Sequence, residues 1–415
     1  MNVGSFASAG HLGLTTLALL LAPACDGAPV LTSGRHPASR PEAAESPATI
    51  DAGRLHADVE FLAAKTMRGR GVGTPENARA AEWIAERFEK LGLEPACNGS
   101  WFHEFRLGDK ACRNVAGLLR VDGADEYVII AAHHDHLGVR GKSIFRGADD
   151  NASGVAGVLA LARVLAERRT ELRRNLVFVS FDAEESGLIG SKRFVASGVI
   201  PTEKTVFMLV FDLIGGHFLP GEENSVYALG SEHSAAVRRV LLARSGASPL
   251  KTRILGTYVI EPAGPLFARS DYAAYRQKRV PYLFVSTATP WYYHTPYDTP
   301  DRLDYEKMAS IVRLSRDVVF DMARFEGRPD FEARSKPEVR EAREIAIMLQ
   351  GMLDAREQFR LGRRAVTELE ARVAALHKMV DAGRVTDRGK RQIQRALITV
   401  LGVARRLRKK TKRAK

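Results

Sequence analysis

Four short, predominantly apolar runs constrain the fold of this chain more than any other feature of its sequence. They cover residues 127–132, 176–181, 206–211 and 282–285, and segments with apolar residues at helical spacing lie between them. Such runs are typical of parallel strands buried on both faces, because helices cover both sides of a parallel sheet. We therefore expect an α/β fold, a three-layer α/β/α sandwich with a mostly parallel mixed sheet.

Acidic and histidine residues follow these runs. His133 and Asp135 end the first run, Glu184 and Glu185 follow the second, and Asp212 follows the third. Because the carboxyl ends of parallel strands meet at one edge of a sheet, where ligands usually bind, we expect these side chains to form one site.

Two further clusters belong with them. Asp149 and Asp150 lie in a turn bounded by glycines that leads into a helix, and His294 follows the last apolar run. Capping of that helix is the alternative role for an acid here, but capping uses one acceptor and does not explain two. Imidazole and carboxylate are ligands that suit zinc, and a carboxylate can bridge two metal ions.

Taken in order, the motifs resemble the co-catalytic zinc aminopeptidase family, which includes bacterial secreted leucyl aminopeptidase and yeast aminopeptidase Y. They are H-x-D at 133–135, A-D-D-N-A-S-G at 148–154, E-E-x-G-L-x-G-S at 184–191, D-x-x-G at 212–215 and Y-H-T-P-x-D-T at 293–299. The resemblance covers residues 53–326. It implies an α/β/α sandwich around a mixed sheet, two Zn²⁺ ions as cofactors, and a cis peptide bond after the bridging aspartate.

The resemblance also assigns the metal ligands residue by residue. It implies that Asp150 bridges both zinc ions. His133 and Asp212 would complete the coordination of one ion, and Glu185 and His294 that of the other.

The remaining polar residues receive other roles from the same resemblance. Glu184 would be the general base, and Asp135 would orient His133. His134 and His136 flank the first motif, and we expect both to support the site or line its entrance rather than to bind metal.

The expected activity is removal of residues from the free amino end of peptides. Two other enzymes of the same fold are alternatives, a carboxypeptidase and a single-zinc glutaminyl cyclase, and so is a non-catalytic, receptor-like binding module. Trp291, Tyr292 and Tyr293 either wall the substrate pocket or pack within the protein.

The N-terminus is predicted to be an export signal. An apolar run at 12–24 is too short to anchor the chain in a membrane, and it ends in Ala-Pro-Ala at 22–24, a pattern of signal cleavage sites. With Cys25 next, we expect residues 1–25 to be a signal peptide or lipoprotein signal, and residues 26–52 to be a flexible linker. The protein would then be exported, as a periplasmic, membrane-anchored or secreted enzyme; a mis-assigned start codon before a cytoplasmic enzyme is the alternative.

Residues 327–415 are predicted to be a basic helical extension. From Lys336 onward the chain has 22 Lys and Arg against 9 Asp and Glu, an excess equal to the +13 charge of the whole chain. Three groups of apolar residues at helical spacing predict three helices: Ile345, Met348, Leu349, Met352 and Leu353; Val366, Leu369, Val373, Leu376 and Val380; and Ile393, Leu397, Leu401 and Leu407.

The basic end of this extension has two interpretations. One is a solvated charged end, and the other is docking onto an anionic lipid or cell-envelope surface. Nucleic acid is disfavoured, because no aromatic residues are interleaved for base stacking. Cys97 and Cys112 are either a disulfide or two free thiols.

Overall fold

The computed structural model describes residues 49–260, 270–333 and 338–413, and for 401–413 it describes the backbone alone. The predicted signal, Cys25, most of the linker and the side chains of the basic end lie outside the described residues. Within them, no helix combines the length and the apolar character needed to cross a membrane.

The described residues form a nine-stranded mixed sheet in the order β1-β3-β7-β4-β8-β11-β9-β10, with β2 paired to β3. Its centre, β7-β4-β8-β11, is parallel, as the buried apolar runs predict. The strands are β1 (Glu94–Pro95), β2 (Phe102–Leu107), β3 (Lys110–Leu119), β4 (Tyr127–His133), β7 (Asn175–Phe181), β8 (Thr205–Phe211), β9 (Ser225–Leu229), β10 (Lys251–Leu255) and β11 (Tyr282–Ser286). A separate hairpin joins β5 (Gly138–Arg140) to β6 (Ser143–Phe145).

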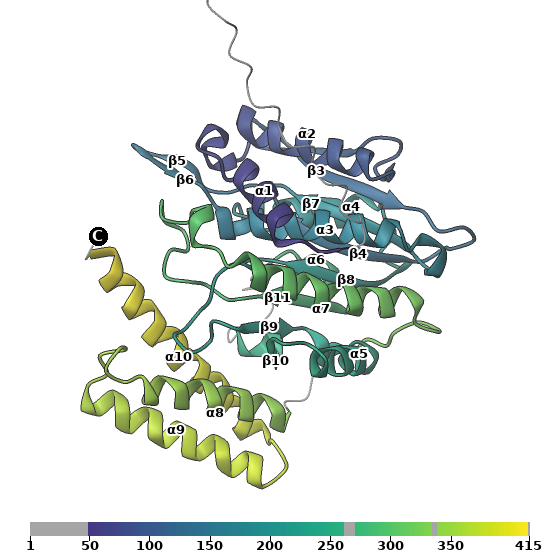
Figure 1. The fold of residues 1–415 in the computed structure, drawn as a ribbon. Coiled ribbons are helices and arrows are strands. Elements are labelled where there is room, and N and C mark those ends of the chain that lie inside the picture. Colours follow the sequence, from purple (N-terminus) through teal and green to yellow (C-terminus); the bar gives the residue numbers. More distant parts are fainter. Residues whose placement is uncertain (1–48, 261–269, 334–337, 414–415) are drawn as a thin grey trace, which may run out of the picture. The chain divides into compact units, whose positions relative to one another are not determined.

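Helices cover both faces of the sheet, so the predicted three-layer sandwich is confirmed (Figure 1). Successive residues of a strand point to opposite faces. Ile130 of β4 accordingly packs with one layer and Ile129 with the other. The first layer contains α1 (Ala52–Leu62), α2 (Pro75–Lys90), α3 (Gly154–Ala166), α5 (Ala235–Gly246) and α7 (Tyr305–Arg324), and the second contains α4 (Ile189–Ser197) and α6 (Tyr272–Gln277).

The three predicted C-terminal helices are α8 (Val339–Asp354), α9 (Arg363–Asp381) and α10 (Asp387–Arg413). They pack together at the β10 end of the sheet, where α8 contacts β10 and α10 contacts the short helix η5 (Thr257–Val259) (Figure 1). Their apolar residues belong to the same hydrophobic cluster as α4 and α6. The extension is therefore packed against the sandwich through a shared core.

Cys97 and Cys112 are both buried free thiols. Burial raises the pKa of Cys97 to about 12 and that of Cys112 to about 11. Of the two states left open by the sequence, the structure has the unpaired one.

Candidate metal centre

The parallel centre of the sheet brings the predicted site residues to one edge. His133 is the last residue of β4, Glu184 and Glu185 follow β7, and Asp212 follows β8. Asp150 lies in the turn η2 (Ala148–Ser153), directly before α3.

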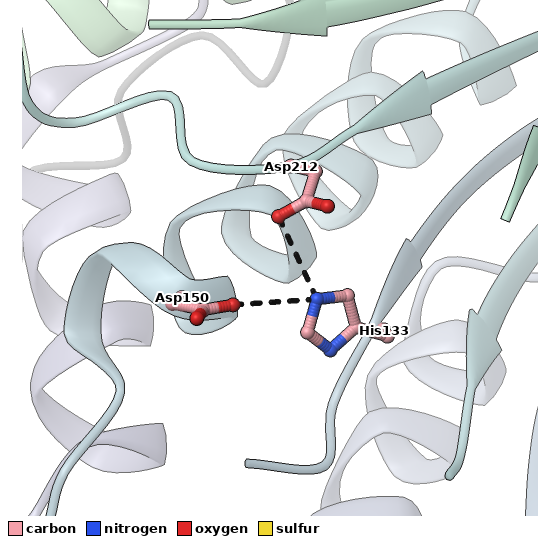
Figure 2. Close-up of side chains that lie close together, drawn as sticks. All are labelled: His133, Asp150 and Asp212. Carbon is pink, nitrogen blue, oxygen red and sulfur yellow. Dashed lines mark ion pairs between the residues drawn. The ribbon is translucent and has the colours of Figure 1, made fainter. Parts of the chain in front are cut away.

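One group of ligand atoms forms around His133. Its Nε2 atom lies 3.5 Å from Asp150 Oδ1 and 3.6 Å from Asp212 Oδ1 (Figure 2). The side chains of His133 and Asp212 are 1% and 9% exposed, so this group is shielded from solvent. We call these atoms the His133 side of the centre.

A second group forms around His294, in the loop after β11. Its Nε2 atom lies 3.1 Å from Asp150 Oδ2 and 3.1 Å from Glu185 Oε2. The side chain of His294 is 34% exposed and those of Asp150 and Glu185 are 4% and 11% exposed, so the His294 ring reaches the surface although its Nε2 atom is buried. We call these atoms the His294 side.

The two oxygens of Asp150 therefore face different ligand groups, which is the arrangement that a bridging carboxylate needs. Zinc ligands lie about 2.0–2.1 Å from the ion, which places neighbouring ligand atoms of a tetrahedron about 3.3 Å apart. The distances on both sides are close to that separation. Asp150 Oδ2, Glu185 Oε1 and His294 Nε2 are also buried, and although histidine and carboxylate atoms lie close together here, none of these three atoms is in a contact with hydrogen-bond geometry. Buried polar atoms normally have partners, so these atoms fit a cation between them.

Glu184 lies beside this pair of groups, with Oε2 3.9 Å from His133 Nε2. Burial and the neighbouring acids Asp212 and Asp271 raise its pKa well above the usual value, although His133 lowers it. The Asp135 carboxylate accepts hydrogen bonds from the backbone N–H groups of Glu184, at 3.0 Å, and Glu185, at 3.2 Å. Asp135 thus fixes the acidic turn after β7. Its Oδ1 atom also lies 3.6 Å from His133 Nδ1.

The loops that carry these groups adopt tight local conformations. Ala183, Leu213 and His294 have positive φ angles of 56°, 63° and 54°, which turn the chain sharply at the strand ends. The peptide bond between Asp150 and Asn151 is cis, as the resemblance implies.

Asp149 does not cap α3, so the capping alternative is wrong for this residue. The side-chain oxygen Oδ1 of Asn151 instead accepts the Gly154 N–H at 3.0 Å. Asp149 Oδ1 accepts the Gly215 N–H at 2.7 Å and so ties the turn before α3 to the loop that follows Asp212.

Asp298 has a structural role that the sequence did not reveal. Its two oxygens accept the backbone N–H groups of Asp149, at 2.8 Å, and Asp150, at 3.1 Å. Asp298 therefore connects the loop of His294 to the bridging carboxylate. Its place in the Y-H-T-P-x-D-T motif was the available signal.

Arg70 is a second residue that sequence reasoning missed, because it lies in a loop far from the motifs. Its fully buried guanidinium donates to four backbone carbonyls: Leu62 at 2.6 Å, His134 at 2.7 Å, Gly147 at 2.8 Å and Arg146 at 2.9 Å. Arg70 thereby holds the end of β4 against the segment that leads to Asp150.

The two extra histidines have different surroundings. His134 is buried with Nδ1 3.0 Å from Ser180 Oγ, away from the ligand groups, and burial lowers its pKa to about 4. His136 Nδ1 lies 2.8 Å from Glu185 Oε1 and 3.7 Å from Asp150 Oδ2. His136, Asp150 and Glu185 could hold a metal ion by themselves, so His136 is closer to the ligand set than we expected from the sequence.

The three aromatic residues before His294 also differ. Tyr293 lines the pocket beside the centre. Tyr292 is buried and donates to Asp149 Oδ2 at 3.2 Å, and the ring of Trp291 packs on that of Tyr292. Of the three, Tyr293 is placed to meet a substrate, and the other two pack within the protein.

Comparisons with known proteins give the same picture of the fold. The model of Peptidase family M28 matches residues 114–319, a range that contains every predicted site residue. The "Uncharacterized protein YfbL" of Escherichia coli (strain K12) is 32% identical over 287 residues, covering 62% of this chain and 84% of that protein.

Two other proteins are informative. The "Glutaminyl-peptide cyclotransferase" of Drosophila melanogaster is 25% identical, covering 60% of this chain and 77% of that protein. The structure of BSAP, a zinc aminopeptidase from Bacillus subtilis, aligns with a TM-score of 0.55 at 14% identity, covering 70% of this chain and all of that one. At this identity the structural match establishes the fold alone.

Proposed function

Because this chain belongs to peptidase family M28, we propose that it is a two-zinc aminopeptidase that removes residues from the free amino end of peptides. The observation that carries this proposal is the position of Asp150, whose two oxygens face separate histidine–carboxylate groups. His133 and Asp212 would hold one zinc ion, and Glu185 and His294 the other.

The chain's own residues account for the proton transfers of peptide hydrolysis. Bound zinc would supply Lewis acidity for the attacking water and the peptide carbonyl. Glu184 would accept a proton from that water and return it to the leaving amine. Its backbone is fixed by Asp135, and its carboxylate lies beside the His133 side.

The charge of the neighbouring pocket favours an amino end over a carboxyl end. Three acids, Asp150, Glu184 and Asp212, lie at the end of the pocket next to the centre. Among the described residues that line this pocket there is no Lys or Arg to pair with a substrate carboxylate. Because zinc would neutralise Asp150 and Asp212, Glu184 is the one acid of the described lining that is not assigned to metal. With that carboxylate and with no cation to pair with a carboxyl end, the described lining favours a free amino end.

A glutaminyl cyclase is the second candidate, since one relative carries that name. A single-zinc cyclase would need only one of the two ligand groups. The presence of both groups, joined by Asp150, favours the two-zinc peptidase.

The test is a zinc count on the purified protein together with assays on matched substrates. We expect two zinc ions per chain, cleavage of free-amine peptides but not of their N-acetylated forms, and loss of activity on chelation that added zinc restores. Cyclisation of N-terminal glutamine with one bound zinc would support the second candidate. Active protein without metal would contradict both.

A further inference from the structure

A small pocket of about 220 Å³ opens beside Glu184 and Asp212. Beyond these acids its walls are largely apolar, and Leu213, Tyr227 and Phe284 are among them. Ligand sites for whole drug-sized molecules are usually about 300–1,000 Å³, whereas an apolar cavity of about 150 Å³ already holds benzene. The pocket therefore matches one apolar side chain rather than a whole peptide.

Two residues of this wall come from the C-terminal extension. Met348 of α8 and Leu397 of α10 both line the pocket, and both are almost completely buried. The range matched by the family model ends at residue 319, before either helix begins. The pocket beside the centre is thus completed by a part of the chain outside the matched peptidase region.

Buried polar contacts hold α8 at the edge of the sheet. Arg253 of β10 donates to Glu344 of α8 at 2.7 Å and to Glu222 at 2.8 Å. Glu341 of α8 accepts the Gly256 N–H at 2.6 Å. Because these charged and polar groups are desolvated, breaking their pairing is costly, which fixes the position of α8.

The helix α10 is held at the same place. Gln394 donates to the backbone carbonyl of Tyr258 at 3.1 Å, and the Lys390 ammonium lies 4.4 Å from the centre of the Tyr258 ring. Leu397 lies one helical turn beyond Gln394, so this contact fixes its position at the pocket.

We propose that the C-terminal extension forms the far wall of the pocket for the substrate's first side chain, and that Met348 and Leu397 set its size limit. This inference rests on the proposed function. The substrate's ammonium group would lie near the acids, and an uncharged apolar side chain of the size of leucine, methionine or phenylalanine would extend toward α8 and α10.

The test measures kcat/KM for free-amine substrates with alanine, leucine, phenylalanine or tryptophan at the N-terminus. Enlarging the pocket by Met348→Ala or Leu397→Ala should raise the tryptophan-to-leucine ratio about tenfold or more, the scale on which small volume changes act in apolar pockets. Filling it by Leu397→Phe should lower the leucine and phenylalanine rates about tenfold and leave the alanine rate unchanged.

Ile398→Ala is the matched control, because Ile398 is the next residue of α10 and is 48% exposed. Its substrate ratios should equal those of the wild type. If the pocket variants change all four rates by one common factor, or if Ile398→Ala changes the ratios as they do, the extension does not form the wall. Melting curves identify a variant that fails to fold. Leu397→Val, which removes only one methylene group, then replaces the alanine variant, with a smaller expected rise in the same ratio.

A binding assay separates this inference from the proposed function. Wild-type protein that contains zinc but cleaves no free-amine substrate would overturn the proposed function. The thermal shift produced by n-butylamine and n-hexylamine would still report on the wall, since both combine an ammonium group with an apolar tail. We expect Leu397→Phe to abolish the greater stabilisation by n-hexylamine, and an unchanged difference between the two amines would overturn the role of the extension.

Discussion

The His133 side and the His294 side of the centre are built differently. The ligands of the His133 side end two central parallel strands, β4 and β8, and His133 is 1% exposed. On the His294 side, His294 lies in a loop and is 34% exposed. Glu185 of the His294 side also follows a central strand, β7, so the two sides differ mainly in their histidine, and they share the bridging residue Asp150.

The two sides also face different surroundings. Asp212 of the His133 side lines the apolar pocket, whereas neither Glu185 nor His294 is among its described lining residues. The His133 side therefore lies next to the proposed side-chain pocket, and the His294 side lies nearer the surface of the protein. Since the proposed mechanism uses both groups together, we expect residues that join the two sides to have the largest effects on activity.

Glu184→Gln tests the proposed general base, which lies beside the His133 side. We expect kcat to fall about 10³-fold, because the amide cannot accept the proton, while the zinc content stays unchanged. Steady-state kinetics and metal analysis measure the two quantities. Glu86→Gln, at an exposed position of α2, is the control and should leave both unchanged. Turnover within a few-fold of the wild type would refute the assignment of Glu184.

Asp298→Asn tests the connection between the His294 loop and Asp150. The asparagine amide would turn a donor toward one of the two backbone N–H groups that Asp298 accepts. Loss of such supporting contacts typically weakens metal binding about 10–100-fold. Because Asp298 supports the bridging residue Asp150, competition with a chromophoric chelator should show weaker binding of both zinc ions. Asp301→Asn, at a nearby exposed position, should have no effect, and an unchanged affinity for both ions would contradict the role of Asp298.

The pH dependence of zinc binding tests the protonation of His294 on the His294 side of the centre. Burial lowers the pKa of His294, but the Asp150 and Glu185 carboxylates outweigh this effect and raise it to about 9. Below that pH the ring must release a proton before it can bind metal, so zinc affinity at the His294 side should rise about tenfold per pH unit. The affinity should level off above pH 9. Titrations with zinc from pH 6 to 10 measure this, and a plateau already at pH 7 would contradict it.

The raised pKa of His294 also predicts how the stability of the metal-free protein depends on pH. A histidine whose folded pKa is raised contributes stability that is fully present below its unfolded pKa of about 6.5. This contribution should be lost as pH rises through about 9. Melting temperatures of the chelated protein should therefore fall over that range, and His294→Gln should reduce the fall.

Removal of metal by a chelator should separate the two sides kinetically. The His294 side is more exposed, so its ion should leave several-fold faster than the ion on the buried side, because the chelator must reach the ligands before they exchange. Zinc release followed with a chromophoric chelator should show two phases. Release in a single phase would mean that the difference in exposure does not control access.

The sequence alone determined the central strands, the sandwich and the chain segments that meet at its edge. Apolar runs and helical periodicity are local signals. A short apolar run that is buried on both faces is typical of a central parallel strand, so these segments could be predicted without knowledge of their neighbours. The strand β9, the edge strand β10 and the outer strand β2 were not predicted. All three lie toward the two sides of the sheet, where strand preference depends on neighbours that lie far away in the sequence.

The tertiary structure alone decided the contacts that support the centre and its pocket. Arg70 and Asp298 each bond to backbone groups dozens to more than a hundred residues away, and no local pattern encodes such a partner. Met348 and Leu397 follow ordinary helical spacing. Periodicity predicts which face of a helix is buried but not what covers it, so only the packing of α8 and α10 on the β10 edge places these two residues beside Glu184.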